Sequence, residues 1–214
     1  MVEGRRPYRS EVRAERARAT RRAIVEAGSA LFVARGFAGT TVDAIAERAG
    51  VSRKTVFSSV GGKVGLLELA VDWALVGDDE PVALAERPVV RELFAETNPH
   101  RAVVLWARMI TDIAGRLALL HPVLTAAADV DEEAARLNEV SERNRLGGAR
   151  GFVERLHGLG AVRAGLTVER AAAMAALLMD PLGYRRLVLG DGWTVEEYAE
   201  WVARLAAASF LAPD

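Results

Sequence analysis

Cysteine is absent from the 214-residue sequence. Its absence excludes disulfide bonds and thiol chemistry, and it fits a reducing compartment without establishing one. Long apolar runs are also missing, since none approaches the roughly 18–20 residues that a membrane-spanning helix needs. The first 22 residues are positively charged, but no apolar segment follows them, unlike in a secretory signal peptide. We therefore expect a cytoplasmic protein with no membrane partner.

The motifs of common enzyme classes are missing as well. The three histidines are far apart and have no cysteine partners, so they lack the spacing of metal ligands. Neither a Gly-x-Ser-x-Gly elbow nor a dinucleotide-binding glycine fingerprint occurs. Gly61-Gly62-Lys63 resembles the end of a phosphate-binding loop, but Phe57 stands where the upstream glycine is needed, and no Ser or Thr follows the lysine. We expect a protein that is not an enzyme and has no cofactor or metal.

Charge is distributed unevenly along the chain. Residues 1–65 contain thirteen Arg or Lys against six Asp or Glu, whereas residues 66–214 contain fifteen against twenty-three. This asymmetry indicates that the first part meets a polyanion. Residues 1–21 hold many of the arginines, among them Arg5, Arg6 and Arg9. This segment is interpreted as an arm, either a solvated tail or one that lies along DNA phosphates or in a minor groove.

The next fifty residues predict three short helical elements. Apolar residues at three- and four-residue steps from Ile24 to Phe32 predict a helix that ends at Arg35-Gly36. Thr40 is the expected cap of a second helix that ends at Gly50. Ser52 is a good N-cap for a third. Two short helices joined by a tight turn at Ala49-Gly50-Val51 have the spacing of a helix-turn-helix.

The third helix exposes a polar face, because Val56 and Val60 occupy its buried positions. Its exposed residues are mostly hydrogen-bond donors and small polar groups, which suit phosphates and base edges. They are Arg53, Lys54, Thr55, Phe57 and Ser58. An ordinary helical corner with a solvated face remains the alternative.

The stretch from Ile24 through Leu67 resembles the DNA-binding domain of the TetR family of bacterial transcriptional regulators. The matching words are LFVARGFAGTTVDAIAERAGVSRKTVF and the following GGKVGLL. The detailed match covers about a fifth of the chain, and the remainder fits only in length and helical character.

The resemblance implies a DNA-binding transcriptional regulator, a repressor released from a palindromic operator by a small apolar or amphipathic ligand. Its partners would be double-stranded DNA, a small-molecule effector and a second copy of the chain. It places Thr41 near a phosphate and Lys63 at the start of the fourth helix, holding the DNA backbone. With the arm included, the expected DNA-binding residues are Arg5, Arg6, Arg9, Thr41, Ser52, Arg53, Lys54, Thr55, Phe57, Ser58 and Lys63.

Three residues depart from the pattern of the family. The family usually has Tyr at the position of Phe57, Phe at the position of Val60, and a residue such as Ser or Asp at the position of Gly62. The lost phenolic hydroxyl removes about one neutral hydrogen bond, roughly 0.5–1.5 kcal/mol. Phe57 could instead pack on a sugar or a thymine methyl.

The rest of the chain predicts an all-α protein of about nine helices. Residues 1–65 would form the basic arm and a three-helix helix-turn-helix domain, and residues 66–214 a helical bundle for ligand binding and dimerisation. After a connection over Gly77–Pro88, helices are expected over about 89–96, 100–120, 131–159, 167–189 and 194–211. Thr167 should cap the fourth of these, and Thr194 with Glu197 should form a capping box.

The last two helices are very apolar and rich in alanine, which lets helices approach closely. By analogy with the family we expect a homodimer through them. Apolar and amphipathic residues in the middle of the bundle are candidate ligand contacts, although a core or solvent role is the more common one. They are Trp106, Met109, Asp112, Met174, Leu178 and Tyr184. The alternative function is a helical protein-interaction module whose helix-turn-helix does not bind DNA.

Overall fold

The structure is a computed structural model that describes residues 6–212, with side chains from residue 12 onward. This part of the chain is helical throughout apart from an isolated β-bridge between Val162 and Leu211, which confirms the predicted all-α class. It contains eleven α-helical segments, close to the nine expected. A 3₁₀ turn (Leu84–Glu86) and a π-helix (Arg185–Gly190) accompany α1 (Arg6–Arg35), α2 (Val42–Ala49), α3 (Arg53–Val60), α4 (Lys63–Val76), α5 (Pro88–Ala95), α6 (Pro99–Leu117), α7 (His121–Ala128), α8 (Glu132–Gly158), α9 (Val168–Leu178), α10 (Pro181–Tyr184) and α11 (Val195–Phe210).

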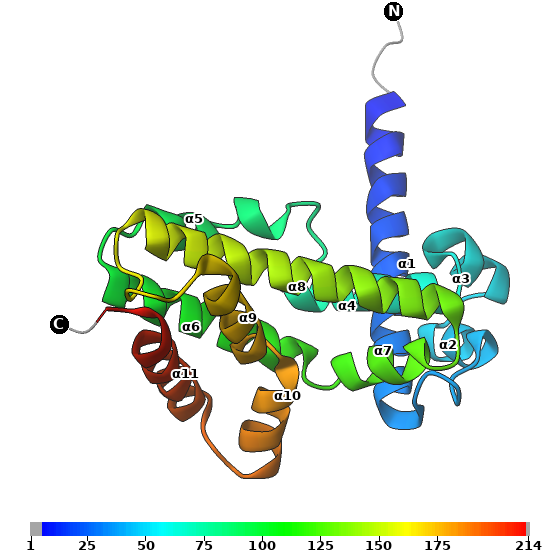
Figure 1. The fold of residues 1–214 in the computed structure, drawn as a ribbon. Coiled ribbons are helices and arrows are strands. Elements are labelled where there is room, and N and C mark those ends of the chain that lie inside the picture. The colour runs from blue at the N-terminus through cyan, green and yellow to red at the C-terminus, as the bar shows by residue number, and fades with distance from the viewer. Residues whose placement is uncertain (1–5, 213–214) are drawn as a thin grey trace, which may run out of the picture.

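The helices form two groups around separate hydrophobic cores (Figure 1). The first core lies among α1 to α4, with α7 and the start of α8 packed against it. The second lies among α6, α8, α9 and α11 in the C-terminal bundle. Figure 1 shows α1 standing at one end of the molecule beside α2 and α3, and α11 at the other end. The long helix α8 runs between the two groups, packing on α7 and on α9.

Helix α4 contributes to both parts of the molecule. Its residues Leu66 and Leu67 are fully buried in the first core. The helix packs on α1 so closely that a Cβ on Gly28 would lie 2.4 Å from Leu66 Cδ2. It also packs on α6 and α8. The boundary expected after residue 65 therefore falls within α4, and the division into two domains stays a prediction.

The expectation of an arm over residues 1–21 is wrong for residues 6–21, which continue α1 without a break. These residues lack apolar periodicity, but they are rich in alanine, arginine and glutamate, which have high helix propensity. Arg6 and Arg9 are part of this helix. Arg5 lies outside the described residues.

The structure corrects one cap and confirms three others. Thr41, not Thr40, caps α2, because its hydroxyl accepts from the backbone N–H of Ala44. The Thr40 hydroxyl is buried and donates to the carbonyl of Gly36 instead. The other expected caps are present: Ser52 on α3, Thr167 on α9, and the Thr194–Glu197 capping box on α11.

Two of the expected helices are divided. The helix expected over 167–189 ends at Leu178, because Asp180 caps a new turn that begins with Pro181. A π-helix then completes the segment. The helix expected over 100–120 ends at Leu117, and α7, which was not expected as a separate element, begins at His121-Pro122.

The connection between α4 and α5 is held by ion pairs to α1. The Asp79 carboxylate accepts from Arg18 Nε and Nη2 at 2.9 and 2.8 Å and from Arg22 Nη2 at 2.6 Å. The Asp79 side chain is only 6% exposed. Hydrogen bonds from Arg18 and Arg22 hold the pKa of this carboxyl well below its usual range. Asp78 is paired with Arg87 within the same segment.

Over residues 6–212, no helix combines the length and the apolar character needed to cross a membrane.

Replacing Asp79 by Asn should destabilise the protein at neutral pH, because two arginines lose their shared charge partner. The native carboxyl has a depressed pKa, so its contribution is complete above its ordinary value of 3.8 and is lost as the pH falls below it. Thermal unfolding of both proteins from pH 2 to pH 7 should show a gap in melting temperature that is constant above about pH 5 and narrows progressively below about pH 4. Asp129→Asn, at an exposed site at the end of α7, is the control. A gap that stays constant with pH would contradict the prediction.

Candidate functional site

Helices α2 and α3 form a helix-turn-helix with well-satisfied ends. Gly50 ends α2 in the left-handed conformation (φ 67°), and its N–H bonds back to carbonyls of the helix. Ser52 then caps α3, accepting from the N–H of Thr55 at 3.1 Å. Val51 donates its backbone N–H to the Ala46 carbonyl, which closes the corner. These bonds fix the direction in which α3 leaves the turn.

Helix α3 is buried on one side and open on the other. Val56 and Val60 are buried in the first core, as expected. Arg53, Lys54 and Ser58 are exposed, Thr55 is half-buried, and Phe57 is 46% exposed, although it is a large apolar side chain. Thr41 and Ser52, at the starts of α2 and α3, are exposed too. The result is a continuous face of donors with an aromatic ring in it.

Arg53 is held in place by weak contacts. Its guanidinium Nη1 pairs with both oxygens of Asp43 at 2.9 and 3.1 Å, and its Cζ lies 5.6 Å from the centre of the Phe57 ring. Arg53 and Asp43 are 60% and 69% exposed, and an exposed pair of this kind contributes only about 0–1 kcal/mol. Arg53 can therefore exchange this partner for another anion or acceptor at little cost.

Lys63 is more firmly held than the sequence suggested. It begins α4, as expected, but its Nζ donates to the Phe37 carbonyl at 2.9 Å and lies 4.0 Å from the centre of the Phe37 ring. An ammonium has three donors, so two remain for other acceptors. Its position ties the start of α4 to the loop between α1 and α2.

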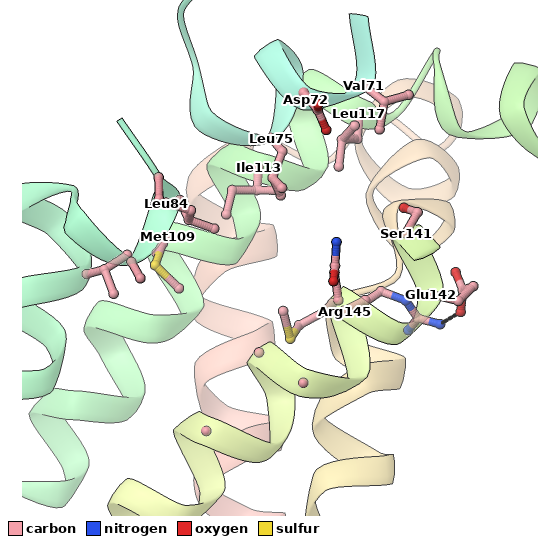
Figure 2. A pocket seen from close by; sticks show the side chains of 18 of the residues that line it. Val71, Asp72, Leu75, Leu84, Met109, Ile113, Leu117, Ser141, Glu142 and Arg145 are labelled. Carbon is pink, nitrogen blue, oxygen red and sulfur yellow. Dashed lines mark hydrogen bonds and ion pairs between the residues drawn. The ribbon is translucent and has the colours of Figure 1, made fainter. Parts of the chain in front are cut away.

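A cavity of about 680 Å³ lies between α4, α6 and α8 and is closed on one side by the segment before α5 (Figure 2). Residues of one stripe of α4 line it, namely Glu68, Val71, Asp72 and Leu75. Leu84 and Ala85 contribute from the segment before α5, and Ser141, Asn144 and Arg145 from α8. Its wall is largely apolar, and its volume suits a drug-sized molecule.

Of the six expected ligand contacts, Trp106 and Met109 line the cavity. The other four do not: Asp112 and Met174 are exposed, Leu178 is half-buried on α9, and Tyr184 is buried against Tyr198. None of these six residues lies on α4, on the segment before α5 or on α8, although all three line the cavity. The α4 stripe repeats at three- and four-residue steps and was a usable signal, but nothing local marks which face of a helix borders a cavity.

One polar cluster lies at the α8 side of the cavity. The Arg145 guanidinium donates to Glu142 and to the carbonyl of Ala176. His121 Nε2 lies 3.9 Å from the other oxygen of Glu142. Figure 2 shows Arg145 turned toward Glu142, while Asp72 lies apart from both, beside Val71 and Leu117. No group of His, Asp and Glu in the described part of the chain is arranged to hold a metal ion.

Residues 24–70 match the sequence model of a family described as bacterial regulatory proteins, tetR family. The fold matches many solved structures. SmeT, the repressor of the Stenotrophomonas maltophilia multidrug efflux pump SmeDEF, solved in complex with triclosan, is 20% identical with a TM-score of 0.68, over 90% of this chain and 92% of SmeT. NalD, the secondary repressor of the MexAB-OprM pump in Pseudomonas aeruginosa, is 19% identical with a TM-score of 0.64, over 90% of this chain and 96% of NalD. No curated protein matches.

Replacing Ser52 by Ala should destabilise the protein by about 1 kcal/mol, because the Thr55 N–H loses its capping acceptor. Urea unfolding would measure the change. Ser59→Ala, in the last turn of the same helix, is the control, and it should be neutral or slightly stabilising because alanine favours the helix. Equal effects of the two substitutions would show that the cap contributes nothing.

Proposed function

Since the chain carries the DNA-binding domain of the TetR family on a TetR-like fold, we propose that it is a sequence-specific transcriptional regulator that binds a palindromic operator. It acts as a repressor and leaves the operator when a small apolar or amphipathic ligand binds. The observation that carries the DNA-binding part is the open face of α3, which presents Arg53, Lys54 and Phe57 on a buried, capped helix.

The composition of this face supports contacts with a DNA groove. An α-helix fits the major groove, where arginine and lysine pair with guanine and where an aromatic ring packs on a thymine methyl. Thr41, Ser52, Thr55 and Ser58 offer hydroxyls to phosphates or bases. Lys63 keeps two donors for the DNA backbone. Arg6 and Arg9, near the start of α1, would reach the DNA from a helix rather than from an arm.

The cavity supports the ligand part of the proposal. Helix α4 lines the cavity with one stripe and packs on α1 and α3 with another, so any ligand that displaces α4 also displaces the helix-turn-helix. The segment before α5 provides a second route, because Leu84 borders the cavity and Asp79 is bound to Arg18 and Arg22 of α1. A ligand shifts DNA affinity only if it binds the two conformations with different affinity. The complex of SmeT with triclosan is consistent with such a site.

Exposed apolar side chains on the last helices support the proposed homodimer. Six of them lie on the segment from α9 to α11, and such patches on a folded protein mark interaction surfaces. They are Met174, Leu177, Leu182, Leu189, Val195 and Leu205. An isologous dimer through this surface would present two α3 helices to the two halves of a palindrome.

Selection from a random pool of double-stranded DNA should enrich one palindrome. On that DNA, Arg53→Ala and Lys54→Ala should each lower the affinity by about 1–3 kcal/mol if the residue reads a base, or should reduce the salt dependence if it contacts a phosphate. Fluorescence anisotropy at several salt concentrations would separate the two cases. Arg91→Ala, at an exposed site on α5, is the matched control. If no palindrome is enriched, the alternative of a helical interaction module that does not bind DNA is favoured.

Leu177→Glu should weaken the dimer roughly tenfold or more, because it places a charge in the apolar interface. Leu177 is 73% exposed within one chain, so the substitution should leave the fold intact. Light scattering over a concentration series would measure dissociation. Val130→Glu, at a site that is 70% exposed at the end of α7, is the matched control and should remain dimeric. Dissociation of both variants, or of neither, would argue against this surface.

A further inference from the structure

The charged residues that line the cavity do not balance. They are Glu68, Asp72, His121, Glu142 and Arg145. Arg145, the one arginine or lysine among the described residues that line the cavity, already donates to Glu142 and to a backbone carbonyl. His121 faces the other oxygen of Glu142. The positive charge of the wall is therefore already paired with Glu142, and of the Arg145 guanidinium only the Nε–H is left without an acceptor among the described residues.

Asp72 and Glu68 are the carboxylates that remain. They stand one turn apart on the stripe of α4 that borders the cavity, and like charges at this spacing repel each other. In the part of the chain that the structure describes, neither carboxylate has a hydrogen bond or an ion pair. Both side chains are exposed to solvent on one side, yet desolvation where Asp72 borders the cavity and the charge of Glu68 raise the pKa of Asp72. The desolvation and the repulsion both disfavour the ionised carboxylate of Asp72, and a bound cation would offset both.

The rest of the wall suits an apolar or aromatic body. Trp106 and Phe152 line the cavity and stack on each other, with ring centres 4.5 Å apart and planes 1° apart. Met109, Leu84 and Ile113 add apolar surface (Figure 2). Trp106 is 1% exposed, and its indole N–H has no acceptor among the described residues. A buried donor without an acceptor is uncommon, and an occupant of the cavity that carries an acceptor within its largely apolar body would satisfy it.

We propose that the cavity takes an amphipathic cation, with its apolar body against Trp106 and Met109 and its positive group at Asp72 and Glu68. This inference rests on the proposed ligand-responsive function and adds the charge of the ligand to it. Because Asp72 and Glu68 both lie on α4, the charge of the ligand would act on this helix. A bound cation would remove the repulsion between the two carboxylates on the same helix that packs on α1 and α3.

Three probes of equal chain length test the charge of the ligand. Decyltrimethylammonium, decanol and decanoate, each kept below the concentration at which it self-associates, would be titrated into the full chain by calorimetry. The cation should bind at least about tenfold more tightly than the other two, as expected for one partly desolvated charge pair. Asp72→Asn should remove most of this preference and leave decanol binding unchanged. Glu68→Gln should reduce it to a smaller extent, and added salt should weaken only the cation.

Asp112→Asn is the matched control, because Asp112 is exposed on α6 and does not line the cavity. It should bind all three probes as the unmodified protein does. If decanol or decanoate binds as tightly as the cation, or if Asp72→Asn keeps the full preference, the inference is overturned while a ligand-responsive cavity stands. If none of the three probes binds, the inference falls, and whether ligand regulation falls with it is decided by screening neutral aromatic probes against the operator complex.

Discussion

The packing of α4 between two cores is the constraint on which the structure depends. Along its inner side, Leu66 fits against Gly28 of α1 at a distance that leaves no room for a side chain at position 28. At its far end, the Arg116 side chain of α6 donates to the carbonyls of Ala74 and Leu75, which have no partner within the helix. The helix is thus fixed to α1 at one end and to the bundle at the other. Neither group of helices can shift without straining one of these contacts.

The ion pairs of Asp79 with Arg18 and Arg22 form a second connection between α1 and the rest of the molecule. They also change how the uneven distribution of charge along the chain is interpreted. The positive balance of the first 65 residues indicates DNA binding, but part of it has an internal partner, because Arg18 and Arg22 bind Asp79 and Glu80. The acidic segment between α4 and α5 therefore acts as an internal counterion for α1. A ligand beside Leu84 would contact the same connecting segment that carries Asp79.

Features that depend on a few neighbouring residues could be predicted from the sequence. The helix-turn-helix, the Ser52 cap, the Thr194–Glu197 box and the buried positions Val56 and Val60 all follow from local hydrogen bonding and apolar spacing. The extension of α1 was missed because helix propensity alone supports it. The cap of α2 was placed one residue early because Thr40 and Thr41 are chemically equivalent, and only packing buries the first.

The cavity could be predicted only in part, since long-range packing decides which helix faces border it. Trp106 and Met109 were identified as apolar residues in mid-bundle, and so were Met174 and Leu178, which do not line the cavity. The break at Asp180-Pro181 ends α9 before Met179, so that α10 and the π-helix do not continue the line of α9. Asp72 belongs to no sequence motif, and only the packing of α4 against α6 and α8 places it at the cavity, one turn from Glu68.

The departures at Phe57 and Gly62 are physically related. A Cβ on Gly62 would lie 3.3 Å from Phe57 Cε1, and Gly62 has a φ of 123°, a conformation that other residues rarely adopt. Glycine at this position therefore gives the aromatic ring room to lie against the chain before α4. The ring in turn lies under the guanidinium of Arg53. Phe57 thus has a contact that needs no hydroxyl: its ring supports the guanidinium of Arg53, which is paired to the exposed carboxylate of Asp43.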